Sequence, residues 1–88
     1  MLTGKTTSGF EFEIEDERLD DYELLEKLCE IDQGNTGKLT SAIADFLGEK
    51  QKEALKEHIR NKNGRISVKK MVGEFAEILN ATKEGKNF

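Results

Sequence analysis

The sequence is 88 residues long with 18 acidic and 14 basic residues, which suits one small, acidic domain. No stretch approaches the roughly 18 apolar residues of a membrane span, and the first ten residues lack the apolar core of a secretory signal. The one cysteine, Cys29, cannot form an internal disulfide. We therefore expect a single domain, residues 1–88, that stays in the cytoplasm and has no membrane partner.

Charge is sorted along the chain. Residues 1–48 hold twelve acids against four bases, whereas residues 49–88 hold six acids against ten bases. An acidic first half and a basic second half predict that copies attract one another head to tail, or that the acidic half meets a basic partner. The alternative is a solvated surface on which the charges happen to be sorted.

Residues 1–15 have the pattern of a β-hairpin. From Phe10 to Glu15, three apolar residues alternate with three glutamates, which is typical of a half-buried strand. Leu2–Thr6 is predicted to pair with this strand through the turn Thr7-Ser8-Gly9. Because an isolated hairpin is only marginally stable in water, its apolar face is expected to pack on helices.

The stretch Leu19–Gly34 is predicted to form one helix. Asp20 is placed to cap its N-terminus together with Glu23, and Gly34 to end it. Four aliphatic residues follow the i, i+1, i+4, i+7 spacing of one helix face, and we expect that face to be buried: Leu24, Leu25, Leu28 and Ile31. Cys29, beside this face, is expected to be half-buried and structural.

Three further helices are expected. The second covers about Leu39–Leu47, capped by Thr36 or Thr40 and closed by Gly48. The third covers about Glu49–Asn61, and a turn at Lys62-Asn63-Gly64 leads to the last, which Ser67 caps and which covers about Val68–Ala81. The last helix has the broadest apolar face: Val68, Met71, Val72, Phe75, Ile78 and Leu79. The predicted fold is α+β, with the hairpin (1–15) packed on about four short helices (16–81) and a flexible tail (82–88).

Catalytic, cofactor and metal motifs are not predicted. The turn around Gly64 has the glycine of an EF-hand, but Ile59 and Lys70 stand where that loop needs its first and twelfth oxygen ligands. His58, the one histidine, has Ala54 and Lys62 at the spacings where a second metal ligand would lie. The basic residues of the second half are interleaved with glutamates and lack aromatic neighbours, which argues against nucleic acid binding. We therefore expect neither an enzyme nor a cofactor-binding protein.

The order of segments across residues 8–80 resembles a known family. The segments are SGFEFEIE, LDDYELLEKLCEID, FLGEKQKEALKEHIRNKNGRIS and MVGEFAEIL. They resemble the tail assembly chaperones of long-tailed bacteriophages and prophages of Gram-positive bacteria. The resemblance implies a non-enzymatic protein of the bacterial cytoplasm that holds the long tape-measure protein until tail tube subunits polymerise around it. It also implies that a longer, frameshifted form of such a protein can exist.

A partner surface is predicted from the acidic helix and the apolar face of the last helix. Its residues, for the client or for other copies in a homo-oligomer, are Asp20, Asp21, Glu23, Glu26, Glu30, Met71, Phe75 and Ile78. Most of the apolar face could instead pack against Leu24 and Leu28 in a monomer core. The alternative function is a small acidic adaptor or regulatory protein that binds another phage or host protein.

Overall fold

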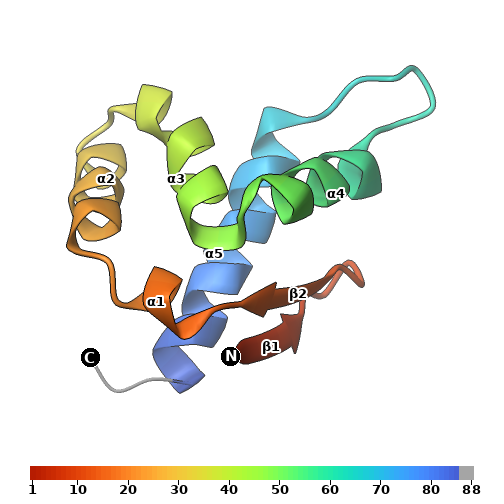
Figure 1. The fold of residues 1–88 in the computed structure, drawn as a ribbon. Helices are drawn as coiled ribbons and strands as arrows, with labels where there is room; N and C mark the ends of the chain where they lie inside the picture. The colour runs from red at the N-terminus through yellow and green to blue at the C-terminus, as the bar shows by residue number, and fades with distance from the viewer. Residues whose placement is uncertain (86–88) are drawn as a thin grey trace.

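The structure, a computed structural model, describes residues 1–85, with all side chains in that range except those of Thr36 and of residues 83–85. The described chain forms a two-stranded hairpin and five α-helices (Figure 1), which confirms the predicted α+β class. The elements are β1 (Leu2–Lys5), β2 (Glu11–Ile14), α1 (Asp16–Leu19), α2 (Tyr22–Asp32), the 3₁₀ turn η1 (Thr36–Lys38), α3 (Leu39–Leu47), α4 (Glu49–Ile59) and α5 (Val68–Gly85). None of the described helices is both long and apolar enough to cross a bilayer.

The hairpin forms as predicted from its alternation. β1 and β2 are antiparallel with Gly4 opposite Phe12, and a Cβ atom on Gly4 would lie 2.6 Å from the tip of the Phe12 ring. Glycine at this position therefore makes room for the ring. On the outer edge of β2, the Gln51 amide accepts from the N–H of Glu13 at 2.7 Å and donates to its carbonyl at 2.6 Å. One side chain of α4 thus takes the place of a neighbouring strand.

The core lies between the hairpin and the helices α3, α4 and α5. β1 packs on α5 and β2 packs on α3, while α4 packs on both α3 and α5. The largest fully buried side chains come from β2, α4 and α5: Ile14, Leu55, Phe75 and Ile78. The rings of Phe46 and Phe75 meet edge to face with centroids 5.9 Å apart. This core confirms that Phe75 and Ile78 belong to the monomer interior.

Helix α2 lies at one side of the molecule, away from the hairpin turn (Figure 1), and packs on α3 and η1. Its predicted N-cap was wrong by one residue. The additional helix α1 ends at Leu19, and its C-cap Asp20 donates its N–H to the carbonyl of Asp16. Asp21 is therefore the extended residue before α2, and its carboxylate accepts from the N–H groups of Glu23 and Leu24. The predicted end is confirmed, since Gly34 has a φ of +102°.

The buried faces are narrower than predicted. Leu25 is 55% exposed, Val68 74% and Val72 44%, and Cys29 is exposed rather than half-buried. Because α2 has α3 and η1 packed along one side, Leu24 on that side is buried while Leu25, one residue round the helix, is not. Leu28 and Ile31 are partly buried against the core. Leu25, Val68 and Val72 were predicted to belong to the core, but they lie on the surface.

The caps and the tail differ in part from the prediction. Ser67 caps α5 as expected, accepting from the N–H of Lys70 at 3.2 Å, and Gly48 closes α3 with a φ of +85°. The start of α3 has no side-chain cap at its N-cap residue Lys38; Thr40 lies inside the helix, and the Thr36 side chain lies outside the described part. Residues 82–85 continue α5 instead of forming a tail, and Thr82 is buried. The rest of the predicted tail, residues 86–88, lies outside the described residues.

Candidate functional site

The predicted partner residues fall into two groups in the structure. The acids Asp20, Asp21, Glu23, Glu26 and Glu30 are all exposed on α2 or just before it. Phe75 and Ile78 are 2% and 0% exposed, so placing them at a surface was wrong for this fold. Met71 is partly buried against the core. Any apolar contact with a partner therefore comes from other side chains.

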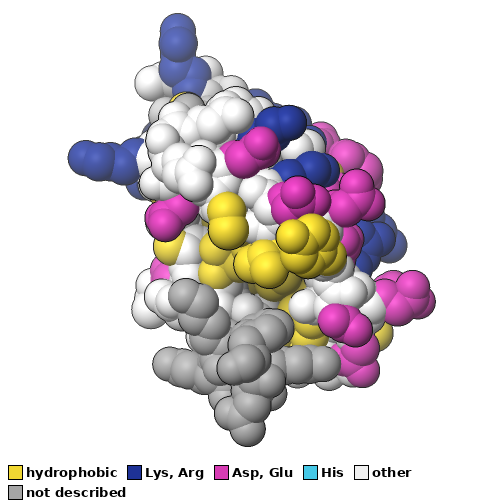
Figure 2. All heavy atoms as spheres, turned by 90° about the vertical axis from the view of Figure 1, so that its left-hand side faces the viewer, with side chains coloured by type: hydrophobic (Ala, Val, Ile, Leu, Met, Phe, Trp, Pro, Cys, Tyr) yellow, Lys and Arg dark blue, Asp and Glu magenta, His cyan; other side chains and the backbone are white. Residues whose placement is uncertain are grey.

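The outer side of α2 carries an apolar stripe beside an acidic one. Tyr22, Leu25 and Cys29 are exposed and follow the i, i+3, i+7 spacing of one helix side. Each is followed directly by an exposed acid, so a second stripe runs parallel to the first: Glu23, Glu26 and Glu30. We call these six residues the α2 surface. Figure 2 shows this side of the molecule, with hydrophobic side chains gathered in the middle and Asp and Glu side chains beside them.

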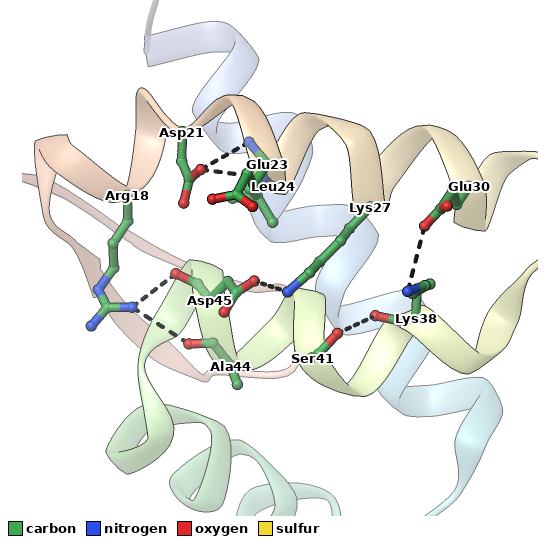
Figure 3. Close-up of polar contacts among 10 residues, drawn as sticks. All are labelled: Arg18, Asp21, Glu23, Leu24, Lys27, Glu30, Lys38, Ser41, Ala44 and Asp45. Carbon is green, nitrogen blue, oxygen red and sulfur yellow. Dashed lines mark hydrogen bonds and ion pairs between the residues drawn. The ribbon is translucent and has the colours of Figure 1, made fainter.

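Polar contacts with α3 set the orientation of α2 (Figure 3). Lys27 reaches across to the carboxylate of Asp45, and this hydrogen bond raises the pKa of the Lys27 ammonium above its ordinary value. Arg18 donates to the backbone carbonyl of Asp45 at 2.8 Å, where a cation suits the C-terminal end of a helix. Since Lys27 is engaged with α3, the outward charge of α2 comes from its acids, the three glutamates and Asp32.

One glutamate of the α2 surface has a partner within the chain. Glu30 lies 3.9 Å from the ammonium of Lys38, and both side chains are about half exposed (Figure 3). An exposed pair at this distance contributes little and breaks readily. Glu30 is therefore available to an incoming cation at small cost.

A second exposed apolar stripe lies on the first half of α5. Val68, Val72 and Ala76 are exposed at i, i+4 and i+8, and the exposed Lys69 stands directly beside Val68 on the helix. We call these four residues the α5 surface. It carries the charge opposite to that of the α2 surface. The sequence does show this stripe as apolar residues four positions apart next to a lysine. It was missed because Val68 and Val72 were predicted to belong to the core.

A hydrogen-bonded cluster joins the hairpin turn to α5. Glu74 is only 6% exposed, and one of its oxygens accepts from the hydroxyls of Thr6 at 2.8 Å and of Ser8 at 2.7 Å. Nε2 of His58 lies 3.0 Å from the Ser8 hydroxyl. Because that hydroxyl has one proton and gives it to Glu74, His58 must donate to Ser8 and cannot accept its proton. The direction of this hydrogen bond is therefore the reverse of that in a nucleophile–base pair, in which the serine hydroxyl donates to the histidine.

The same turn has a second attachment to α5. One carboxylate oxygen of Glu77 accepts from the N–H of Thr7 at 2.8 Å, and the other accepts from its hydroxyl at 3.0 Å. Glu74 and Glu77 together fix the hairpin turn over the middle of α5. Sequence reasoning missed this role; a hydroxyl-rich turn and a glutamate within the apolar face of the last helix were the available signals.

The turn around Gly64 is held by its own side chains. The Asn61 side-chain oxygen accepts from the N–H groups of Asn63 at 2.9 Å and Arg65 at 3.0 Å, and Gly64 has a φ of +78°. Within the described residues no three His, Cys, Asp or Glu side chains gather in a way that could hold a metal ion. This turn reverses the chain within the eight-residue connection, residues 60–67, between α4 and α5.

No protein-family model matches this chain, and comparison with curated proteins and with solved structures found no similar protein. The functional proposal therefore draws on the two surfaces and on the resemblance seen in the sequence.

Proposed function

We propose that this chain is a non-enzymatic binding protein, a phage tail assembly chaperone that covers the tape-measure protein in the cytoplasm of the bacterial host during tail assembly. The observation that carries this proposal is the α2 surface, where large apolar side chains are exposed beside a row of acids. Exposed apolar side chains grouped with charge are typical of protein-binding surfaces. The order of segments across residues 8–80 supplies the particular role.

The physical requirements of such a chaperone fit a surface of this size. A long helical client with uncovered apolar stripes aggregates, since each stripe is an association surface. Many small, charged domains would cover the stripes and add repulsion between clients. Because the cover must later leave, each contact should be weak, with many copies holding the client together. Three exposed side chains on one short helix suit a weak contact.

The test is coexpression with the long protein encoded by the neighbouring tape-measure gene, followed by affinity capture of that client. We expect a soluble complex with several copies of this chain per client, measured as the mass ratio in the captured material. If the client stays insoluble and captures none of this chain, although the chain alone is folded, the chaperone proposal fails.

The acidic residues before α2 favour the adaptor as the second candidate. Asp20 and Asp21 are exposed next to the α2 surface and extend its acidic side. An adaptor would use this region to bind a basic patch on a single phage or host protein. It would give a complex with one copy of each partner and would leave the solubility of the tape-measure protein unchanged.

A further inference from the structure

The two exposed stripes of this chain complement each other. The α2 surface has three apolar side chains beside acids, and the α5 surface has three beside Lys69. Both extend over eight residue steps of helix, or roughly 12 Å. We propose that the α2 surface of one copy packs against the α5 surface of a second copy.

The order of residues sets the direction of this contact. On α2 each acid follows its apolar neighbour by one position, and on α5 Lys69 follows Val68 in the same way. Both charged side chains are therefore displaced in the same rotational sense around their own helix. When two such helices face each other, only an antiparallel arrangement brings the displaced charges to the same side. The copies thus pack with α2 antiparallel to α5, which also pairs opposite ends of the two helix dipoles.

The neighbourhood of each surface strengthens the charge match. Exposed Arg65 and Lys62 precede the α5 surface in the chain, so the antiparallel arrangement places them toward the C-terminal end of α2, where Glu30 and Asp32 are exposed. The contact thus joins the acidic half of one copy to the basic half of another. Few apolar side chains take part, so we expect a dissociation constant of about 0.1–1 mM at low salt. Added salt should weaken the association because the charges remain close to solvent.

The contact between copies does not depend on the proposed function, but its relation to client binding does. If the client's helices bind these same surfaces, client binding and self-association compete. The free chaperone would then cover its own apolar stripes until a client replaces the neighbouring copy.

The experiment is charge reversal with rescue, read as weight-average mass by light scattering across a concentration series. Glu30→Lys and Lys69→Glu should each raise the dissociation constant about fivefold, because each replaces an attraction by a repulsion at the same end of the antiparallel contact. The double variant E30K/K69E restores opposite charges across the contact and should return to within about twofold of the wild type. Glu53→Lys makes the same charge change on an exposed residue of α4 and should leave the association unchanged.

A second measurement locates the contact directly. Cys29 is the single cysteine of the chain and is exposed within the α2 surface, so a photocrosslinker attached there samples only its surroundings. We expect crosslinks to residues 68–76 of another copy. A wild type that stays monomeric at millimolar concentration would overturn the proposal. So would a double variant no better than the single ones, or crosslinks to another copy that fall outside α5. None of these results bears on client binding, which the coexpression tests separately.

Discussion

Glu74 is the residue whose charge the fold uses most directly. Its carboxylate is buried beneath the hairpin turn and accepts from two hydroxyls, one of which, on Thr6, is itself only 5% exposed. A buried hydroxyl without an acceptor loses its hydrogen bond to water and gains nothing in return. Glu74 therefore supplies an acceptor for the hydroxyls of the hairpin turn, and those hydroxyls supply donors for its buried carboxylate.

Replacing Glu74 should consequently be costly. We expect Glu74→Ala to lower the free energy of unfolding by about 2–3 kcal/mol, because it removes the buried carboxylate to which the Thr6 and Ser8 hydroxyls donate. Glu26→Ala, on the exposed side of α2, should stay within about 0.5 kcal/mol of the wild type. Urea unfolding followed by circular dichroism measures both. Equal effects of the two substitutions would show that the turn is not held by Glu74.

Phe75 tests the division between core and surface. Its ring is 2% exposed and packs edge to face on Phe46, so we expect Phe75→Ala to cost about 3–5 kcal/mol. Leu28→Ala should cost less, because Leu28 is only partly buried. The same urea experiment ranks the two variants. A Phe75→Ala protein of near wild-type stability that no longer associates would instead place Phe75 at an interface.

At the scale of elements, α2 depends on polar contacts with α3 as well as on Leu24. The Lys27–Asp45 pair joins the two helices, and its hydrogen bond raises the pKa of Lys27. A group whose pKa is raised by folding contributes stability below its unfolded pKa, and that contribution is lost as the pH rises through the folded pKa. For lysine this window begins at about pH 10.4.

The pair therefore predicts a pH-dependent difference. Lys27→Met should lower the urea midpoint at pH 7 relative to the wild type, and the difference should shrink as the pH rises beyond 10.4, where the wild-type ammonium also loses its charge. Midpoints at pH 7, 9 and 11 measure it. A difference that stays constant over this range would mean that Lys27 acts through packing of its alkyl chain.

Most strands and helix ends were predicted well, because both depend on a few residues that are adjacent in the sequence. The alternation from Phe10 to Glu15 predicted a strand, and Gly34, Gly48 and Ser67 marked helix ends, since backbone conformation and capping depend on a few adjacent residues. The N-cap of α2 is Asp21 and not Asp20, because Asp20 is the C-cap of the short helix α1. A one-turn helix of four residues has no periodicity from which to predict it.

Burial was less predictable because it depends on where whole elements pack. Spacing placed Leu25, Val68 and Val72 on apolar faces, but it could not show that α2 is covered mainly along one side, or that the first turn of α5 is exposed. For the candidate site, the acids of α2 were predicted correctly as exposed residues. The apolar partners were not, since Phe75 and Ile78 were needed for the core.

At the scale of the molecule, the part that forms the core is separate from the side that carries the α2 surface. The hairpin, α3, α4 and α5 form the core, and the carboxylates of α5 fix the hairpin turn. Helix α2 lies to one side with apolar and acidic stripes facing outward (Figure 2). A substitution on the α2 surface should therefore alter binding while leaving the core intact, which makes the proposed function testable with folded variants.

The soluble fraction of the tape-measure protein, measured during coexpression, tests the proposed chaperone role most directly. We predict that the wild-type chain keeps the client soluble and that Ala54→Ser, which alters an exposed apolar residue of α4, does the same. The variant Tyr22→Ser/Leu25→Ser removes most of the apolar stripe of the α2 surface and should return the client to the insoluble fraction, although the variant itself remains folded. A client equally soluble with all three chains, or insoluble with all three, would contradict the account.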